Sequence, residues 1–283
     1  MSRKRKVTLR AQWLGKLLKE LRLENELTLK EVGEHIRRDF TTLSRFEAGI
    51  QPIHQSELLA LMDLYGLEGE NQRNTLLQLG QEQTKTGWWE KYSKQAESWF
   101  LDYLWVESRA QTIRAYDAMP VNGLLQTPEY AEAWIRAVNP NESATFVERG
   151  VELRLARQRV LVRDEPMELS VIMDEAALHR LVGGRDVMKA QLRHLMDQST
   201  HPHIELRVLP YSAGEHASPD GGFSLIKMED PFPQIAYTLG PAGGLYLEAE
   251  QADKLDGMLG RLRSVSLDCE ESVALIAALE KRL

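Results

Sequence analysis

The sequence predicts a multidomain fold in which an all-α domain of five helices precedes an α+β domain. Apolar residues recur at helical spacing through the first 81 residues, whereas strand-like apolar segments appear only after residue 160. A polar stretch at 82–87 (EQTKTG) separates the two patterns. We therefore assign 1–81 to the first domain, 82–87 to a linker and 88–283 to the second domain.

Helix-capping patterns mark the elements of the first domain. Thr28 and Glu31 have the spacing of a capping box, in which each side chain bonds the backbone amide of the other residue. Asp39 is expected to cap the next helix, and Gly49 follows where a helix commonly ends. The predicted helices cover about Leu9–Glu24, 28–36, 39–48, 56–64 (opened by Ser56) and 70–81.

The second domain mixes strands and helices. Its predicted strands are 168–173, Ile204–Leu209, Phe223–Met228 and 235–239. Helical patterns cover Pro128–Val138, 147–162, a segment from Asp174 and 186–199. Two further helices close the chain, and Asp268 with Glu271 is expected to cap the last one.

Aromatic residues are concentrated where the second domain begins. The cluster consists of Trp88, Trp89, Tyr92, Trp99, Phe100, Tyr103 and Trp105, and the spacing 88, 92, 99, 103 suits one helix face. One interpretation is a buried aromatic seam between segments. The other is a ligand or partner site, for which the candidates are Trp88, Trp89, His216 and Asp220, the last two in a glycine-bearing loop.

Charge is distributed unevenly along the chain. The net charge is −7, yet residues 1–45 hold 12 lysines and arginines against 6 acidic residues. Residues 67–283 hold 23 against 33. This asymmetry is typical of a basic nucleic-acid module joined to an acidic domain, although a solvated basic face would give the same balance.

Cysteine content and hydropathy exclude some classes of protein. A single cysteine, Cys269, excludes an internal disulfide framework and a cysteine-rich zinc site, and we expect it to be packed. Charged residues interrupt any signal-peptide core, and no segment reaches the roughly 18 apolar residues that span a bilayer. We expect a cytoplasmic, nucleoid-associated protein without membrane contact.

Residues 27–49 (LTLKEVGEHIRRDFTTLSRFEAG) carry the most specific motif. They combine a polar cap, two helices with a short turn, and a Thr/Ser-rich second helix ending in Arg-x-Glu-x-Gly. The segment resembles the XRE family of helix-turn-helix regulators, whose members are similar to phage repressors. The matching residues are Thr28, Thr42, Ser44, Arg45, Glu47 and Gly49. The resemblance implies a lambda-repressor-like, five-helix domain that binds double-stranded DNA.

A helix in the major groove meets base edges through its N-terminal residues. The predicted base contacts are accordingly Phe40, Thr41, Ser44 and Arg45, with Leu43 and Phe46 pointing inward. The predicted phosphate contacts are Thr28, Lys30, Arg37, Arg38 and Thr42. An N-terminal arm of Arg3, Lys4, Arg5 and Lys6 is a further candidate for the backbone or minor groove.

Each of these assignments has a structural alternative. Arg45 could instead pair with Glu47 or Glu34 and only stabilise the domain, Phe40 could belong to the core, and the arm could simply be solvated. Two residues depart from the family pattern. Arg37 stands where the turn often has glycine, and Leu29 replaces a frequent phosphate-contacting residue.

From about Trp88 onward, six short stretches support a second resemblance. They are GLLQTPEYAEA (123–133), RQRVL (157–161), DEAALHRLVGG (174–184), QLRHL (191–195), VLP (208–210) and GGF (221–223). The chain here resembles the large domain of actinobacterial WhiJ-like regulators. Asn122 departs from the usual Pro-Gly-Leu-Leu-Gln-Thr pattern. The resemblance implies a regulator paired with a small acidic partner protein, as an antitoxin is with its toxin.

We do not expect an enzyme. Metal, nucleophile-elbow and phosphate-loop motifs are missing from the sequence, and Pro202 between His201 and His203 prevents a helical ligand pair. No catalytic residue, metal or cofactor is therefore assigned. The arginine run at 149, 154, 157, 159 and 163 lies beside Glu148 and Glu152, which favours surface ion pairs.

These observations predict a sequence-specific transcriptional regulator. We expect a homodimer on two DNA half-sites, because one helix in one groove gives limited affinity. The acidic domain would respond to a small-molecule effector or a small partner protein. One alternative is an antitoxin-like protein that sequesters a small cognate partner and autoregulates, and a DNA-tethered enzyme is another.

Overall fold

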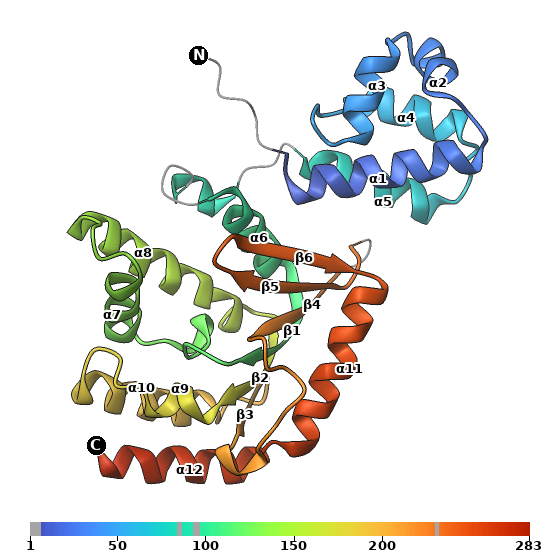
Figure 1. Cartoon of the computed structure of the whole chain (residues 1–283). Helices are drawn as coiled ribbons and strands as arrows, with labels where there is room; N and C mark the ends of the chain where they lie inside the picture. The colour runs from blue at the N-terminus through green and yellow to red at the C-terminus, as the bar shows by residue number, and fades with distance from the viewer. Residues whose placement is uncertain (1–6, 84–86, 93–96, 230–231) are drawn as a thin grey trace. The chain divides into compact units, whose positions relative to one another are not determined.

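The computed structural model describes residues 7–83, 87–92, 97–229 and 232–283 (Figure 1). The chain divides into two compact units, Met1–Glu90 and Lys91–Leu283. The described part of the first unit folds into five α-helices, and the second unit contains a six-stranded sheet with helices. The predicted multidomain fold, a helical domain followed by a mixed one, is therefore confirmed.

The first unit consists of short helices around one apolar core. The helices are α1 (Leu9–Glu24), α2 (Leu29–Ile36), α3 (Phe40–Glu47), α4 (Gln55–Leu64) and α5 (Glu70–Glu82). The prediction for α4 was wrong by one residue. The backbone amide of His54 donates to Glu57 Oε2 at 3.1 Å, so the helix begins at Gln55 and Ser56 is its second residue.

Side-chain caps begin the helices where the sequence predicts. The Thr28 amide donates to Glu31 Oε2 at 2.8 Å, and the Glu31 amide donates to Thr28 Oγ1 at 3.2 Å. Asp39 accepts the amide of Thr42 at 2.8 Å. These bonds satisfy amide groups that have no partner within their own helix. The predicted capping box and the predicted cap of the third helix are both confirmed.

Glycine allows α1 and α3 to lie unusually close. A Cβ atom at Gly15 would lie 2.4 Å from the carbonyl oxygen of Glu47 and 2.7 Å from that of Phe46. Gly49 ends α3 with φ +67°, and a Cβ there would lie 2.8 Å from the carbonyl oxygen of Ala11. The position of α3 against α1 therefore requires glycine at both places.

The second unit is built on a mixed sheet with the strand order β3-β2-β1-β4-β5-β6. The strands are β1 (Ala110–Asp117), β2 (Glu168–Asp174), β3 (Ile204–Leu209), β4 (Phe223–Met228), β5 (Ile235–Gly240) and β6 (Gly243–Glu248). β1, β2 and β3 are parallel, whereas β4 runs antiparallel to β1, and β4, β5 and β6 are joined in antiparallel pairs.

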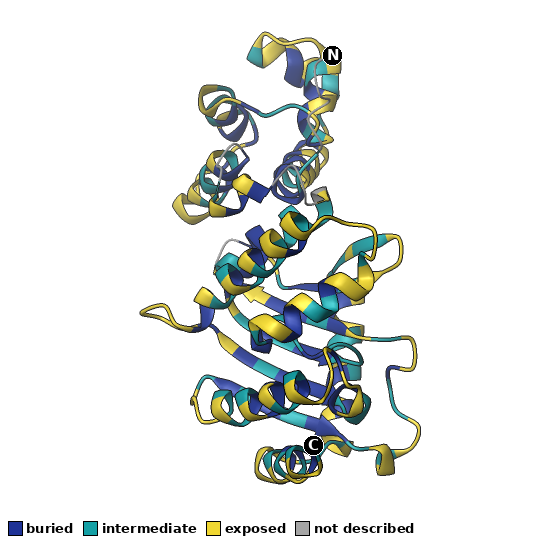
Figure 2. Cartoon of the chain, turned by 90° about the vertical axis from the view of Figure 1, so that its left-hand side faces the viewer, coloured by how far each residue is buried: buried dark blue, intermediate teal, exposed yellow. Residues whose placement is uncertain are grey.

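Helices pack against both faces of this sheet. They are α6 (Ser98–Arg109), α7 (Pro128–Val138), α8 (Ala144–Arg157), α9 (Glu175–His179), α10 (Arg185–Gln198), α11 (Glu250–Val265) and α12 (Cys269–Arg282). Tyr116 and Leu225 share one apolar cluster with Leu262 of α11. Tyr237 lies on the opposite face, where its ring is 4.5 Å from that of Tyr103 in α6. Buried residues follow the central strands, and the outer sides of the helices are exposed (Figure 2).

Two strands, β1 and β6, were not predicted. α6 ends at Arg109 and β1 begins at Ala110, so no turn residues separate the two elements. β1 is nevertheless the central strand on which the parallel and antiparallel halves of the sheet meet. β6 begins with two glycines and lies at the edge of the sheet, where none of its residues is fully buried.

The expectation that residues 88, 92, 99 and 103 share one helix face was wrong. Trp88–Tyr92 form a short 3₁₀ turn, and α6 begins only after Glu97, whose backbone is extended (φ −65°, ψ 154°). Trp105 is buried on α6, as are Trp89 and Tyr92 in the turn, whereas Trp88 is 39% exposed. The aromatic residues therefore serve two separate elements.

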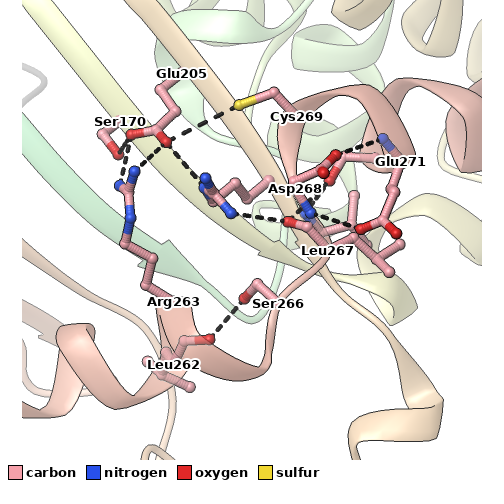
Figure 3. A network of polar contacts seen from close by, with 12 residues as sticks. Ser170, Glu205, Leu262, Arg263, Ser266, Leu267, Asp268, Cys269 and Glu271 are labelled. Atoms are coloured by element: carbon pink, nitrogen blue, oxygen red, sulfur yellow. Dashed lines mark hydrogen bonds and ion pairs between the residues drawn. The ribbon is translucent and has the colours of Figure 1, made fainter.

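Cys269 is exposed at the first turn of α12, so the expectation of a packed thiol was wrong. It lies beside a polar network centred on Glu205 of β3 (Figure 3). Glu205 accepts hydrogen bonds from Arg263 at 2.6 and 2.7 Å, from Arg207 at 2.9 Å and from Ser170 at 2.8 Å. Burial raises the pKa of Glu205, but these bonds outweigh burial and lower it to about 2. The network fastens α11 to two strands of the sheet.

Candidate functional site

The candidate site in the first unit is the segment from α2 to α3. Arg37 ends α2 in the left-handed conformation (φ 56°, ψ 45°), which is the conformation glycine adopts most easily. Gly33 lies one turn earlier, and a Cβ atom there would be 2.6 Å from the carbonyl oxygen of Arg38. The departure from the family pattern at Arg37 therefore preserves a tight turn.

α3 presents one apolar face to the core and one polar face to solvent. Leu43 and Phe46 are 1% and 3% exposed, as predicted. Phe40 is 61% exposed, so the alternative that it belongs to the core was wrong. The four predicted base-contacting residues, Phe40, Thr41, Ser44 and Arg45, are all exposed on α3.

Arg45 does not pair with Glu47. The carboxylate of Glu47 is bound by Arg22 of α1, with Nε–Oε1 at 2.6 Å and Nη2–Oε2 at 3.0 Å. Arg22 also donates to the carbonyl oxygen of Leu27 at 2.8 Å, and both charged side chains are less than 10% exposed. Glu34 lies 3.9 Å from Lys30 instead. Within the described residues, Arg45 makes no hydrogen bond or ion pair and so keeps its donors available.

The two threonines predicted to contact phosphates are used in helix caps. Thr28 donates its hydroxyl to Glu31 at 2.7 Å, and Thr42 donates its hydroxyl to Asp39 at 2.9 Å. These bonds lower the pKa of both carboxyl groups. Each hydroxyl proton is committed to a carboxylate, so these side chains would have to exchange that bond to donate to DNA.

The predicted phosphate-binding cations differ in their freedom. Arg38 is paired with Glu57 of α4 at 2.5 Å, and Lys30 has only the long, exposed contact with Glu34. Arg37 is exposed and makes no side-chain bond or ion pair within the described residues. Arg37 and Lys30 are thus the more available of the three. The predicted arm, Arg3 to Lys6, lies outside the described residues.

The four candidates for a ligand or partner site are divided between the two units. Trp88 and Trp89 belong to the first unit, with ring centroids 5.8 Å apart, whereas His216 and Asp220 belong to the second. His216 packs edge-on against Tyr116 at 5.6 Å and accepts the amide of Ser218 at 3.3 Å. Asp220 is exposed in the same loop.

The arginine run of α8 is not the set of surface ion pairs expected. Arg157 is buried and forms a two-pronged bond with Glu107 of α6, with both N–O distances 2.7 Å. Burial lowers the pKa of Arg157, but the carboxylate of Glu107 raises it by more, so the guanidinium of Arg157 stays charged. Glu107 lies 50 residues away in the sequence, and local spacing gave no signal of this partner.

Sequence reasoning also missed Arg22, the residue that fixes the end of α3. Its partner Glu47 is 25 positions away, and spacing within one helix does not reveal such a contact.

Among the described helices, none is both long and apolar enough to cross a lipid bilayer.

Comparison with known families agrees with the two-part architecture. Residues 13–76 match the model of a helix-turn-helix domain, the class of domain that binds DNA. Residues 100–278 match a domain of unknown function (DUF5753). No curated protein and no solved structure matches the chain. Because the second match spans more than half of the sequence, the chain belongs to the family of proteins that carry this domain of unknown function.

Proposed function

We propose that this protein is a sequence-specific transcriptional regulator that reads the major groove of DNA through α3. The observation that carries the proposal is the polar face of α3. Its arginine is left free because Glu47 is held by Arg22, while Leu43 and Phe46 anchor the opposite face. A free, charged, exposed donor on a rigid helix is what base recognition requires.

Each exposed residue of α3 suits a particular contact. Arg45 can donate two hydrogen bonds to one guanine, and Thr41 and Ser44 can donate to or accept from neighbouring base edges. Phe40, exposed at the start of the helix, can pack on a thymine methyl group. Arg37 and Lys30 supply backbone contacts that weaken with salt. A homodimer on two half-sites would provide the affinity that one helix lacks.

The second unit supplies regulation rather than catalysis in this proposal. Its net negative charge makes it a poor surface for DNA, so it is suited to respond to another molecule and change the affinity of the first unit. The resemblance to WhiJ-like regulators favours the same division of labour.

The test begins with selection of preferred sites from random DNA by the full-length protein. Binding to the selected site is then measured for Arg45→Ala and for a matched arginine control, Arg73→Ala. Arg73 lies on α5 and pairs with Asp63. We expect Arg45→Ala to weaken binding by about 5- to 150-fold, the equivalent of one lost guanine contact. The control should remain within about twofold.

Two results would overturn the proposal. One is the absence of any preferred sequence after selection. The other is an Arg45→Ala variant that binds the selected site as tightly as the wild type, which would remove α3 from the interface. Arg45 is exposed and makes no hydrogen bond or ion pair within the described residues, so we expect the Arg45→Ala variant to fold. Circular dichroism of each variant checks this, so that weaker binding is not mistaken for loss of folding.

A further inference from the structure

The second unit contains a cavity of about 250 Å³ at the end of β1. It is bounded by the segment that follows β1, by the start of β4, by β5, and by α6, α7 and α8. Its lining includes Trp99, Asp117, Asn122, Trp134, Arg154 and Tyr237. A second cavity of about 160 Å³ shares Phe100, Arg154 and Arg157 with it.

The topology of the sheet opens this place for a ligand. The chain leaves β1 toward β2 on one side, and after β3 it returns to β4 on the other side of β1. In open sheets, segments that part in this way leave a crevice beyond the carboxyl end of the strand, where ligands bind. Gly222 lines the crevice at the entry to β4, where a Cβ atom would lie 2.6 Å from the carbonyl oxygen of Tyr116.

Aromatic side chains form much of the cavity wall. The ring of Tyr237 lies 4.5 Å from that of Tyr103, and Phe100 stacks on Tyr103 at 6.3 Å. The ring centroids of Trp99 and Phe100 are 5.6 Å apart. The Tyr246 hydroxyl donates to the backbone oxygen of Trp99 at 2.8 Å. A wall of fixed rings offers a flat ligand contact area at low entropic cost.

Arg154 is the unusual group in this cavity. Within the described part of the chain, its guanidinium makes no hydrogen bond or ion pair. Burial, together with the positive charge of Arg157, lowers its pKa to about 10, so it remains charged at neutral pH. A charge in this position is costly unless it has a partner. Among the described residues none is bonded to it, since the nearby carboxylate of Glu107 is bound by Arg157.

Gly123 leaves the space that the guanidinium occupies. A Cβ atom at Gly123 would lie 2.9 Å from Arg154 Nη1 and 3.4 Å from Arg157 Nη1 and Nη2. The two arginines thus converge on one backbone position beside the cavity. Only Arg157 is paired with a carboxylate, so the charge of the Arg154 guanidinium is left without a bonded counter-ion there.

Asp117 also lines the cavity but faces other polar groups. It accepts a hydrogen bond from Asn122 Nδ2 at 2.7 Å, and burial raises its pKa to about 6. Among the described residues, no hydrogen bond or ion pair joins Asp117 to Arg154. Asp117 instead supplies an acceptor for an N–H or O–H group of a ligand.

We propose that this cavity binds a small planar organic anion, whose carboxylate or phosphate pairs with Arg154 and whose ring lies among the aromatic residues of α6 and β5. The guanidinium fork matches both kinds of oxyanion. An apolar cavity of about 150 Å³ holds a benzene ring, so 250 Å³ suits a body of one or two rings. The inference deepens the proposed regulation by naming its effector class, but ligand binding here does not depend on DNA binding by α3.

The test is isothermal titration calorimetry on the full-length protein without DNA. The probes are benzoate, 2-naphthoate, indole-3-acetate, phenyl phosphate and 2-naphthyl phosphate, each beside the neutral amide or alcohol with the same ring. We expect at least one anion to bind, and its neutral counterpart to bind at least about tenfold more weakly, as the loss of a charge-assisted pair requires. Preference for carboxylates or for phosphates identifies the acidic group.

Two variants locate the binding. Arg154→Gln removes the cation, and Gly123→Ala places a methyl group against Arg154 Nη1 while leaving the arginine in the chain. Arg154→Gln should weaken binding of the anion at least about tenfold. Gly123→Ala should weaken it less, because the flexible end of Arg154 can move away from the new methyl group. The control is Arg159→Gln, an exposed arginine that lines neither cavity and should leave binding unchanged.

Three results would overturn the proposal. These are no binding by any probe, equal binding by anions and their neutral counterparts, and unchanged binding by Arg154→Gln in a folded protein. If Arg154→Gln fails to fold, the comparison of each anion with its neutral counterpart decides the question. A protein that binds a probe but selects no DNA site would refute the proposed function and leave this inference standing.

Discussion

Replacing Glu47 by glutamine should weaken the first unit without touching its DNA-facing side chains. In the wild type, the buried guanidinium of Arg22 makes two bonds to Glu47 and one to the carbonyl oxygen of Leu27. The amide of glutamine is neutral and can accept only one of the two. Arg22 then keeps a charge that is 9% exposed and has no counter-ion in the pair.

The size of the effect follows from this burial. Removing one partner of a buried ion pair costs about 3–5 kcal/mol, and the remaining acceptor places Glu47→Gln near the lower limit of about 3 kcal/mol. A unit of this length has roughly 4–13 kcal/mol of stability at typical values per residue. Each kcal/mol corresponds to roughly 4–8 °C in the melting temperature of such a domain, so Tm should fall by more than about 10 °C.

Urea unfolding of the full-length protein measures this loss. Incorporated 5-fluorotryptophan gives a separate ¹⁹F signal for Trp13, which is buried in the first unit and reports on it alone. The control is Glu34→Gln, whose carboxylate is 69% exposed and should change stability by less than about 0.5 kcal/mol. A loss below about 1 kcal/mol for Glu47→Gln would show that the pair does not hold α3 to α1.

Three further outcomes are expected. Arg37→Gly should raise the free energy of unfolding measured in urea by about 0.5–1 kcal/mol, since glycine relieves the left-handed backbone; a lower free energy of unfolding would contradict this. Because burial raises the pKa of Asp117 to about 6, the folded protein binds this proton more tightly than the unfolded chain, and stability falls as pH rises from about 4 to 6. Asp117→Asn should therefore add about 1–2 kcal/mol to the free energy of unfolding at pH 7.5, and a loss of stability there would refute the reasoning. The lowered pKa of Glu205 contributes stability that is complete above pH 4.5 and is lost as pH falls toward 2. Because solvent screens this partly exposed group, thermal melts in acid should show a loss of about 1 kcal/mol in the wild type that is missing from Glu205→Gln.

The elements that the sequence predicted best are those with local rules. The capping box of Thr28 and Glu31 lies within four residues, and the apolar faces of α1 and α3 repeat at helical spacing. Such signals do not depend on the rest of the chain. For the same reason the alternating patterns of β2, β3 and β4 were found almost to the residue.

What the sequence could not predict depends on residues far apart in the chain. The Arg22–Glu47 pair crosses 25 positions and the Arg157–Glu107 pair crosses 50, so the spacing of charges within one helix suggested the wrong partners. β1 was hidden because it follows α6 without a turn. The cavity around Arg154 is assembled from several elements, and none of them reveals it alone.

The close approach of Gly15 to α3 separates two tasks that a recognition helix must perform. The buried side is constrained so tightly that a single methyl group at Gly15 would collide with the carbonyl oxygen of Glu47. The outer side carries Phe40, Thr41, Ser44 and Arg45, and it contributes little to packing. Under the function proposed above, substitutions at these four positions would change the preferred DNA sequence while leaving the packing of α3 on α1 intact.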